Sequence, residues 1–402
     1  MKTLYISYDG MTDPLGQSQV IPYLEGLSKK GHEIHLISCE KPSLFQEKKE
    51  LISKILTSAN IIWHPVLYTA KPPVLSTLWD IYKIKKLSIQ LHIKNKFDAV
   101  HCRSYISALI GEQLKLKYGI TFIFDMRGFW ADERVDGALW NIQNPVFKKI
   151  YIYFKNKEKD FIKNADSIIS LTDAAKQYMI QTFHVEDSKI TVIPCATDLN
   201  LFKPSDAKSK ADLRKKLGLT DADYVISYVG SVGTWYLLDE MLDFFVELKK
   251  QKKSSKFLFV TAENPDYILQ KSSLKNISNS DLIIKKADRK EMPLYISISD
   301  ASLFFIKDSF SKKASSPTKH GEILSCHIPV VCNKIGDLDR IVNFRKTGLI
   351  VEKFTKNDYC DIIKKLLDGF KPSDEDFDAT TNEFYSLENG IEKYGQIYNR
   401  LN

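Results

Sequence analysis

The chain has 402 residues, of which 44% are apolar and 27% charged, and its net charge is +8. These values are typical of a soluble globular protein with two or three domains. The modest charge argues against a nucleic-acid binder and allows an anionic ligand or membrane surface. The six cysteines form no Cys-x-x-Cys pair, which indicates reduced thiols in a cytosolic protein rather than a disulfide framework or zinc site. We expect no signal peptide, and no apolar run approaches the ~20 residues that span a bilayer.

Strands and helices alternate through the first half. We predict strands at 4–8, 33–38, 99–102, 121–125, 167–171 and 190–193, and helices at 18–31, 105–117, 147–164 and from 173. This alternation predicts a parallel sheet with helices on both faces. Ligands of such sheets bind beyond the carboxyl ends of the strands, so the loops at 9–17, 102–105 and 125–136 share one rim.

The pattern breaks between Pro194 and Pro204, and a lysine-rich stretch at 203–216 predicts a linker. It then resumes, with predicted strands at 224–229, 257–261, 282–284 and 302–306 and helices at 237–250 and 291–297. We therefore predict an α/β protein of two Rossmann-like, doubly wound domains facing each other across a cleft. The expected domains are residues 1–200 and 201–380, with a C-terminal helix in 381–402 that packs back on the first domain.

The stretch from 315 to 333 is predicted to run from loop to helix to a strand at 330–332. Pro317 is suited to the first helical position, and Ser315 and Ser316 can cap the helix. The free amides of a helix N-terminus and the ammonium of Lys319 suit a phosphate, and Glu322 lies one turn further on. A carboxylate there can accept hydrogen bonds from ribose hydroxyls. A capped surface helix with a solvated lysine and glutamate fits the same spacing.

Three further loops carry polar residues. Gly16 and Gln17 follow the first strand, where a glycine lets a ligand phosphate or sugar approach the backbone, although a plain strand–helix turn fits as well. The charged loop at 125–136 predicts either ion pairs or recognition of an acceptor molecule. The acceptor candidates on it and on the neighbouring strand are His101, Arg103, Arg127, Asp132, Glu133 and Arg134.

Two segments are basic and amphipathic. Residues 81–97 carry five lysines and no acid, and residues 146–163 carry six lysines among aromatic side chains. Such segments can dock on anionic lipid headgroups, or they can be ordinary helices with a solvated lysine face.

Four stretches together resemble one family. They are Gly16-Gln17, Ala-Asp-Ser-Ile-Ile-Ser-Leu-Thr at 165–172, Val-Ile-Pro-Cys-Ala-Thr-Asp at 192–198 leading to Phe202, and Gly-Glu-Ile-Leu-Ser-Cys-His-Ile-Pro-Val-Val at 321–331. In order and spacing they resemble the retaining glycosyltransferases of family 4, with the GT-B fold, over nearly the whole chain. The resemblance implies a nucleotide-sugar donor in the second domain, an acceptor in the first, and usually no metal.

The resemblance assigns Glu322 to the ribose and Gly16 to the donor phosphate. Two features of the family are missing. Its first glutamate corresponds to Ala314 here, and its diphosphate-clamping Arg and Lys are absent from 230–236. We therefore predict that Lys319 supplies the missing charge, with Lys307 and Lys312 as further candidates. The remaining predicted donor contacts are Gln17, Gly230, Ser231, Gly233, Thr234, Ser315, Ser316 and Thr318.

Asp125 ends a strand at which the family often carries a histidine, and we predict that it contacts the reacting hydroxyl or sugar. Asp125 and Lys319 are thus the catalytic candidates. The predicted function is a hexosyltransferase of surface polysaccharide biosynthesis that uses a glycan or lipid-linked acceptor, with retention and without cofactor or metal. We expect it in the cytoplasm, with peripheral contact to an anionic membrane as a further expectation. A nucleotide-sugar epimerase of the same architecture and a non-catalytic GT-B binding module are the alternatives.

Overall fold

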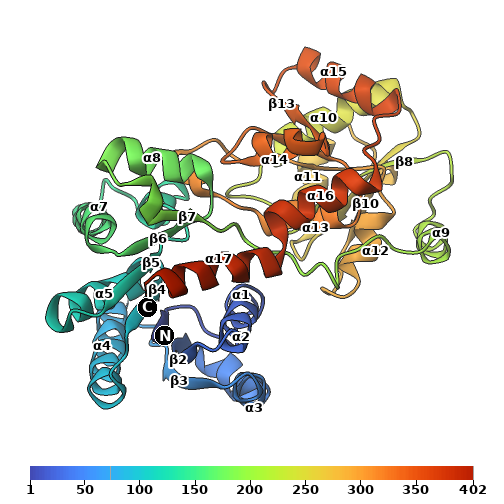
Figure 1. The fold of residues 1–402 in the computed structure, drawn as a ribbon. Coiled ribbons are helices and arrows are strands. Elements are labelled where there is room, and N and C mark those ends of the chain that lie inside the picture. The colour runs from blue at the N-terminus through green and yellow to red at the C-terminus, as the bar shows by residue number, and fades with distance from the viewer. Residues whose placement is uncertain (73, 402) are drawn as a thin grey trace. The chain divides into compact units, whose positions relative to one another are not determined.

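The computed structural model describes residues 1–72 and 74–401, and the chain divides into two compact units (Figure 1). Unit 1 comprises Met1–Cys195, Lys313–Ser315 and the segment from Leu387 onward. Unit 2 comprises Ala196–Lys312 and Ser316–Ser386. The chain therefore changes unit after Cys195 and after Ser386, compared with the predicted boundaries at 200 and 380. The final residue of the predicted segment 381–402 lies outside the described residues.

Unit 1 is built on a seven-stranded parallel sheet in the order β3-β2-β1-β4-β5-β6-β7. Its strands are β1 Lys2–Ser7, β2 Glu33–Glu40, β3 Ile61–Leu67, β4 Ala99–Arg103, β5 Thr121–Asp125, β6 Ser167–Ser170 and β7 Ile190–Val192. Ser7 pairs with Arg103, and Arg103 pairs with Asp125, so β1, β4 and β5 end level at one edge. β4 is buried throughout, as expected for a strand covered by helices on both faces.

Nine α-helices surround this sheet in the described part of unit 1. They are α1 Pro14–Gln19, α2 Ile21–Lys29, α3 Pro42–Ser58, α4 Leu75–Asn95, α5 Ser104–Tyr118, α6 Trp130–Asp136, α7 Pro145–Asn164, α8 Asp173–Phe183 and α17 Leu387–Arg400. The helix predicted at 18–31 is wrong in extent, because the chain leaves helical geometry at Val20. The segment 125–136, predicted as a loop, contains α6. β3 was not foreseen because Pro65 lies within it, and a proline is tolerated there because β3 is the edge strand.

Unit 2 is built on a six-stranded parallel sheet in the order β10-β9-β8-β11-β12-β13. Its strands are β8 Tyr224–Val229, β9 Ser255–Val260, β10 Leu282–Lys285, β11 Ala301–Phe304, β12 Val330–Asn333 and β13 Gly348–Val351. Its helices are α9 Ala207–Lys216, α10 Leu238–Gln251, α11 Pro265–Ser273, α12 Met292–Ser297, α13 Thr318–Ser325, α14 Leu338–Arg345, α15 Lys356–Leu367 and α16 Asp374–Tyr385. The predicted α/β class with two doubly wound parallel sheets is thus confirmed.

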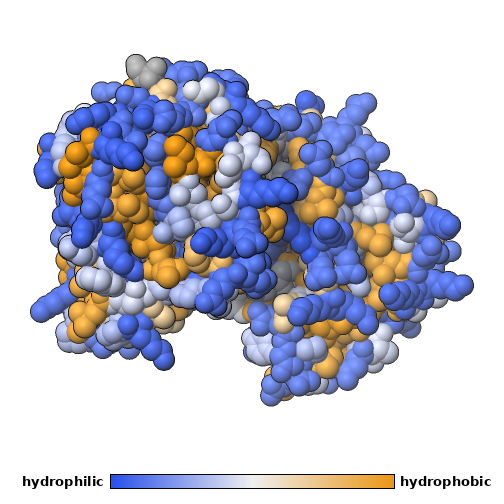
Figure 2. Space-filling model, turned by 90° about the horizontal axis from the view of Figure 1, so that it is seen from below, coloured by the Kyte–Doolittle hydropathy of each residue, from blue (hydrophilic) through white to orange (hydrophobic). Residues whose placement is uncertain are grey.

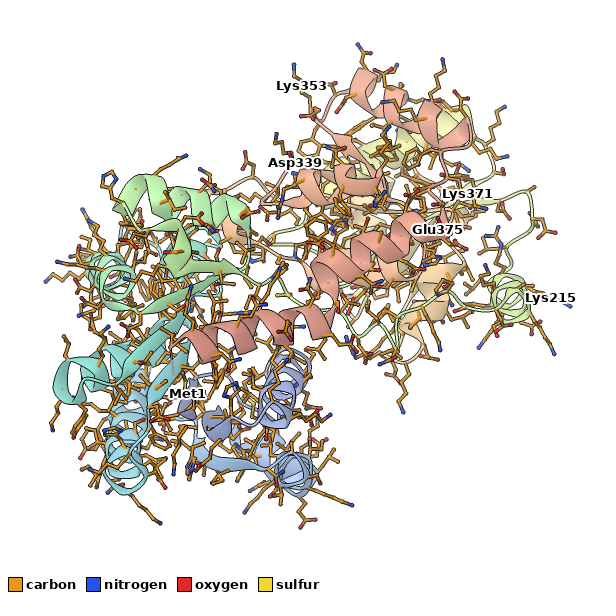
Figure 3. All side chains as sticks on the ribbon, in the orientation of Figure 1. Met1, Lys215, Asp339, Lys353, Lys371 and Glu375 are labelled. Atoms are coloured by element: carbon orange, nitrogen blue, oxygen red, sulfur yellow. The ribbon has the colours of Figure 1, made fainter. Side chains whose placement is uncertain are left out.

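The predicted linker at 203–216 is mostly helix α9. The side chain of Asp206 caps this helix by accepting a hydrogen bond from the amide of Ser209 at 2.9 Å. Its lysines are solvated, and Figure 3 shows Lys215 pointing away from the helix. The lysine-rich composition therefore marked an exposed helix face rather than an irregular linker.

The single helix predicted near the C-terminus is two helices that belong to different units. α16 begins at a capping box formed by Ser373 and Asp376 and ends at Tyr385, and Ser386 is extended. In unit 1, α17 packs closely on α2, where a Cβ atom at Gly26 would lie 2.4 Å from the Ile391 side chain. No described helix is long and apolar enough to cross a membrane.

Candidate active site

Three loops are tied together at the carboxyl edge of the unit 2 sheet. Tyr236, in the loop after β8, forms an antiparallel bridge with Ile306, which follows β11. The amide of Lys307 donates to the carbonyl of Trp235 at 2.8 Å. The Asn333 side chain at the end of β12 exchanges two hydrogen bonds of 2.8 Å with the backbone of Ile306. These bonds tie the 230–237 loop to the segment that follows β11, which is tied in turn to the end of β12.

Lys319 on α13 lies beside this loop and is 8% exposed. Its Nζ donates to the hydroxyl of Tyr228 at 3.0 Å and lies 3.5 Å from the centre of the Tyr236 ring. A Cβ atom at Gly230 would come within 3.0 Å of the same Nζ, so this glycine leaves room for the ammonium beside the backbone. No described carboxylate lies within ion-pair distance of Lys319. Burial lowers the pKa of Lys319 to about 7, and the nearby charge of Glu322 opposes that shift.

The start of α13 differs from the prediction. Pro317 is the N-cap rather than the first helical residue, and no side chain caps the helix. The predicted capping by Ser315 and Ser316 is therefore wrong, because the chain enters the helix through the extended Pro317. Ser315 belongs to unit 1, whereas Ser316 and Thr318 belong to unit 2. The alternative of a solvated Lys319 is also excluded by its burial.

Glu322 lies one turn further along α13, with 13% of its side chain exposed. Its Oε1 accepts a hydrogen bond from Arg289 at 3.1 Å, and the same guanidinium lies 5.1 Å from the Phe202 ring. Burial raises the pKa of Glu322, while Arg289 and Lys319 act in the opposite direction. Arg289 was not foreseen, because a lone arginine in an exposed basic loop has no spacing that connects it to a glutamate 33 positions away.

A second lysine reaches the loop that lacks cations in the sequence. Lys312 is largely buried, and its Nζ lies 3.7 Å from the centre of the Trp235 ring. Ser231, Gly233 and Thr234 lie in the same loop, and the carbonyl of Ser231 accepts a hydrogen bond from Tyr228. The donor contacts predicted for these residues stay predictions. The fold nonetheless brings two cations to this loop from outside its own sequence.

Asp125 occupies the corresponding edge of the unit 1 sheet and has no exposed surface. Tyr394 on α17 donates to its carboxylate at 3.0 Å, and the guanidinium groups of Arg127 and Arg103 lie at 3.8 and 3.9 Å. Burial acts to raise the pKa of Asp125, but Arg127, His101 and Arg103 together lower it below its usual value. The carboxylate is therefore charged and paired within unit 1.

Each neighbour of Asp125 has at least one hydrogen bond, while His101 Nε2 and Arg103 Nη1 are buried without a hydrogen-bond partner. His101 shares a hydrogen bond with Tyr398 at 2.9 Å, Arg103 donates to Asp9 at 3.2 Å, and Arg127 donates to the sulfur of Cys195 at 3.2 Å. Burial lowers the pKa of His101, which favours the neutral ring. A base must reach the proton it removes, so the catalytic role predicted for Asp125 stays a prediction, and this geometry supports a positioning role that fastens α17 to β4 and β5.

The other predicted acceptor residues lie on α6. Asp132 accepts hydrogen bonds from Tyr151 at 2.8 Å and Lys155 at 2.7 Å, both on α7. The Arg134 guanidinium lies 5.0 Å from the Trp130 ring, and Glu133 is half-buried beside it. These contacts fasten α6 to α7, and contacts of Asp132, Glu133 and Arg134 with an acceptor stay predictions.

The loop after β1 is packed against itself. A Cβ atom at Gly16 would lie 2.2 Å from the carbonyl oxygen of Gly10, so glycine is required here for close backbone packing. Gln17 donates to the carbonyl of Thr12 at 2.9 Å. The buried carboxylate of Glu40 accepts from the amides of Met11 and Thr12 at 2.7 and 3.0 Å. The buried role of Glu40 was not predicted, since a carboxylate at the end of a strand is usually expected to be exposed to solvent.

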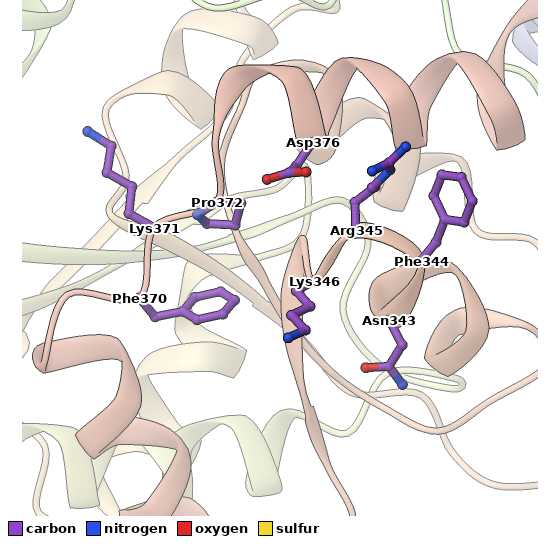
Figure 4. Close-up of a pocket in the computed structure, with 8 residues that line it drawn as sticks. All are labelled: Asn343, Phe344, Arg345, Lys346, Phe370, Lys371, Pro372 and Asp376. Atoms are coloured by element: carbon purple, nitrogen blue, oxygen red, sulfur yellow. The ribbon is translucent and has the colours of Figure 1, made fainter.

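A cavity of about 420 Å³ lies in a different part of unit 2 (Figure 4). α14 leads from β12 back to the start of β13, so its end lies at the amino edge of the parallel sheet, whereas Lys319 lies at the carboxyl edge. The cavity is lined by Asn343, Phe344, Arg345, Lys346, Phe370, Lys371, Pro372 and Asp376.

Among the described residues, no group of three or more His, Cys, Asp or Glu side chains could hold a metal ion.

Two parallel α/β units, with polar loops gathered at the carboxyl edges of their sheets, define the GT-B class of folds. Solved structures of this class cover essentially the whole chain. Sucrose-phosphate synthase of Thermosynechococcus elongatus has a TM-score of 0.72 at 16% identity and covers 100% of this chain and 99% of its own. The Anabaena protein HepE in complex with UDP and glucose has a TM-score of 0.68 at 13% identity, covering 99% of each chain.

Sequence comparison gives the family. The model of Glycosyltransferase Family 4 matches residues 19–201, and that of Glycosyl transferases group 1 matches residues 209–383. The chain belongs to the family-4 glycosyltransferases, and the predicted resemblance is confirmed. D-inositol 3-phosphate glycosyltransferase 2 of Catenulispora acidiphila is 20% identical over 69% of this chain, which spans 64% of that relative's length. Alpha-monoglucosyldiacylglycerol synthase of Acholeplasma laidlawii is 23% identical over 87% of this chain and 83% of its own length.

Proposed function

We propose that this protein transfers a hexose from a nucleotide-sugar donor to a glycan or lipid-linked acceptor, with retention of the anomeric configuration. The observation that carries the proposal is the buried ammonium of Lys319, which lies against Gly230 without a carboxylate partner among the described residues. A buried cation is costly unless something compensates its charge. A donor diphosphate beside the 230–236 loop would supply that compensation.

In this proposal Lys319 replaces the diphosphate clamp that the loop lacks. Breaking the bond between the sugar and the phosphate leaves growing negative charge on the diphosphate, and preorganised cations lower that barrier by several kcal/mol. The Tyr228 hydroxyl and the Tyr236 ring hold Nζ in place before the donor arrives. Lys312, against Trp235, supplies a second cation at the same loop.

The ribose is assigned to Glu322. The Arg289 guanidinium holds one oxygen of its carboxylate and favours the charged form in a partly buried setting. A charged carboxylate accepts hydrogen bonds from adjacent ribose hydroxyls more strongly than a neutral acid does. A UDP complex of the neighbour HepE is consistent with a nucleotide-sugar donor.

Retention is proposed to follow from attack on the face that the diphosphate leaves. The bond between the anomeric carbon and the diphosphate oxygen breaks, and the acceptor oxygen bonds to the same carbon on the same face. The acceptor proton passes to the departing phosphate oxygen. Lys319 stabilises the charge that develops there, and no metal or cofactor is required in this scheme.

The acceptor side is proposed from the relatives. One is named for an inositol phosphate acceptor and another for a glucosyldiacylglycerol product. We assign this protein to surface glycan or glycolipid synthesis from the cytoplasm, with peripheral contact to an anionic membrane. The six cysteines, all free thiols, suit a reducing compartment.

A ligand panel tests the donor assignment. UDP-, GDP- and ADP-glucose are added separately to the full chain, and thermal unfolding is followed. A donor at 100 times its dissociation constant stabilises by about 2.7 kcal/mol. Mass spectrometry of mixtures with and without a diacylglycerol acceptor then separates the alternatives. Acceptor glycosylation supports the proposal, acceptor-independent conversion of the sugar identifies an epimerase, and binding without turnover identifies a non-catalytic module.

A further inference from the structure

Helix α4 in unit 1 carries apolar side chains on its exposed side as well as on its inner side. Four of its five buried residues are polar, and the buried set is Ser76, Asp80, Ile84, Ser88 and His92. Its exposed side carries Leu75, Leu78, Trp79 and Tyr82, each more than half exposed and spaced at i, i+3, i+4 and i+7. A surface helix ordinarily buries its apolar stripe. The outward face of α4 therefore has the composition of a surface that is covered by a partner.

The charges around this face have a single sign. The only acid on α4 is Asp80, which is fully buried and paired with Lys83 at 2.8 Å. The only acid on the adjacent α5 is Glu112, which is buried and paired with Lys157 at 2.9 Å. α4 and α5 thus expose lysines and no carboxylate. Figure 2, which views the molecule from below, shows several apolar patches framed by hydrophilic side chains on the surface.

A hollow continues the apolar face between the two helices. It has a volume of about 360 Å³ and a mainly apolar lining that includes Ile89, Ile110 and Leu114. Lys85 and Lys117 line the same hollow, so its rim carries cations. Trp79 and Tyr82 stack on each other at 5.4 Å between ring centres on the outside of α4. Aromatic rings beside lysines suit the boundary between lipid headgroups and acyl chains.

We propose that the outward face of α4, with the α4–α5 hollow, docks on an anionic lipid bilayer. Leu75, Leu78, Trp79 and Tyr82 enter the boundary between headgroups and acyl chains, and Lys85 and Lys117 meet lipid phosphates. A second copy of this chain is a poorer occupant. A twofold contact through this face would bring the same lysines together without any exposed acid to offset them. The proposal specifies where the membrane contact of the proposed function is made.

Helix α7, the other basic segment, differs in its charge pairing. Lys155 binds Asp132 at 2.7 Å and Glu158 at 2.5 Å, and Lys157 binds Glu112 and Asp160. Two lysines of α7 are thus paired with carboxylates inside unit 1. Lys148 and Lys149 remain exposed on α7, on the same helix as the exposed Val146, Ile152 and Tyr153, and provide a matched control that removes the same charge at another site.

Flotation of the full chain with lipid vesicles tests the docking surface. Wild type is mixed with phosphatidylcholine vesicles and with vesicles that also contain phosphatidylglycerol, at low and high salt, without donor or acceptor. Binding is expected only with the anionic vesicles and weaker at high salt. Lys85→Gln with Lys117→Gln is expected to weaken it about 30-fold, since each lysine near an anionic surface contributes ~1 kcal/mol. Trp79→Ser with Tyr82→Ser is expected to abolish it.

The control is Lys148→Gln with Lys149→Gln, which removes the same charge from α7 and is expected to leave vesicle binding within about threefold of wild type. Circular dichroism and thermal unfolding confirm that each variant is folded. Equal losses in the α4–α5 and α7 lysine variants would show unspecific charge attraction and overturn the proposal. So would absence of wild-type binding, or a dimer in light scattering that Trp79→Ser with Tyr82→Ser disrupts. Because neither donor nor turnover is involved, failure here leaves the proposed transferase function untouched.

Discussion

The two sheets each bury a charged side chain at their carboxyl edge, but the two charges are satisfied differently. In unit 1, Asp125 is surrounded by Tyr394, Arg127 and Arg103, which pair and orient its carboxylate. In unit 2, Lys319 is buried between the rings of Tyr228 and Tyr236 and has a hydroxyl as its hydrogen-bond partner. The first arrangement balances its charges within unit 1, with Asp125 Oδ1, His101 Nε2 and Arg103 Nη1 left without a hydrogen-bond partner. The second leaves a cation without a carboxylate among the described residues.

This difference separates a charge that holds the fold from one that awaits a ligand. Removing one partner of a buried ion pair leaves the other charge buried without a counter-charge, which lowers the stability of the fold. Removing a buried cation without an anionic partner removes a cost instead. Stability and activity should therefore respond in opposite ways at the two edges, and each prediction below tests that contrast.

The largest effect is expected from Asp125→Ala. It leaves Arg127 and Arg103 without their buried counter-charge, and we expect the free energy of unfolding to fall by about 3–5 kcal/mol. Urea unfolding followed by circular dichroism measures the change. Asp160→Asn, in an exposed ion pair with Lys157, is the control and should cost less than about 1 kcal/mol. Normal stability of Asp125→Ala with complete loss of turnover would instead identify Asp125 as a catalytic group.

Lys319→Met should lower turnover without lowering stability, the opposite of what we expect for Asp125→Ala. Turnover should fall about 10²–10³-fold, because the variant loses a preorganised charge at the leaving diphosphate. The free energy of unfolding should stay the same or rise, since the buried cation is gone. Lys353→Met, at an exposed lysine of unit 2 (Figure 3), is the control and should change neither quantity. Undiminished turnover of Lys319→Met would rule out this lysine as the clamp.

Glu322→Gln and Arg289→Gln test the ribose assignment in the same unit. Each should weaken binding of a nucleoside diphosphate by about 10- to 100-fold, as expected for loss of a hydrogen bond to a charged group. Binding of inorganic diphosphate should not change, because it has no ribose. Isothermal titration calorimetry with both ligands measures the two affinities. An equal loss for both ligands would show that the variants distort the phosphate site instead.

The smallest effect is expected from pH. The pKa of Lys319 is about 7 in the free protein, and the diphosphate of a nucleotide sugar prefers the charged lysine. Affinity should therefore fall about tenfold between about pH 6 and about pH 8 as the lysine loses its proton. Lys319→Arg keeps its charge in this range and should remove the pH dependence. A wild-type affinity that is constant over this range would show that Lys319 does not face the diphosphate.

The same group has a defined effect on stability. Its folded pKa lies below the unfolded value, so between about pH 7 and about pH 10 the unfolded chain binds more protons. The contribution of Lys319 to the free energy of unfolding of the free protein should thus increase as pH rises through that window. Lys319→Met should remove this part of the pH dependence, which urea unfolding at several pH values can measure.

The sequence by itself determined the class of fold and the helix that carries the candidate site. The alternation of strands and helices sets a parallel sheet because successive parallel strands need crossover helices. The order of the loops then follows from that topology. Lys319 and Glu322 could be predicted from local spacing as well. Two helical residues that are three positions apart lie about one turn apart on the same face, wherever the helix lies in the fold.

The tertiary structure decided which charges are paired. Asp125 and Tyr394 are 269 positions apart, and Arg289 and Glu322 are 33 apart, so no local spacing connects either pair. The loop at 230–236 has no cation of its own, yet Lys319 and Lys312 reach it from segments that follow β11. Local periodicity fixes elements because it acts over one turn or one strand. Whether a charge is buried, paired or left uncompensated depends on side chains that only the packed fold brings within a few ångströms.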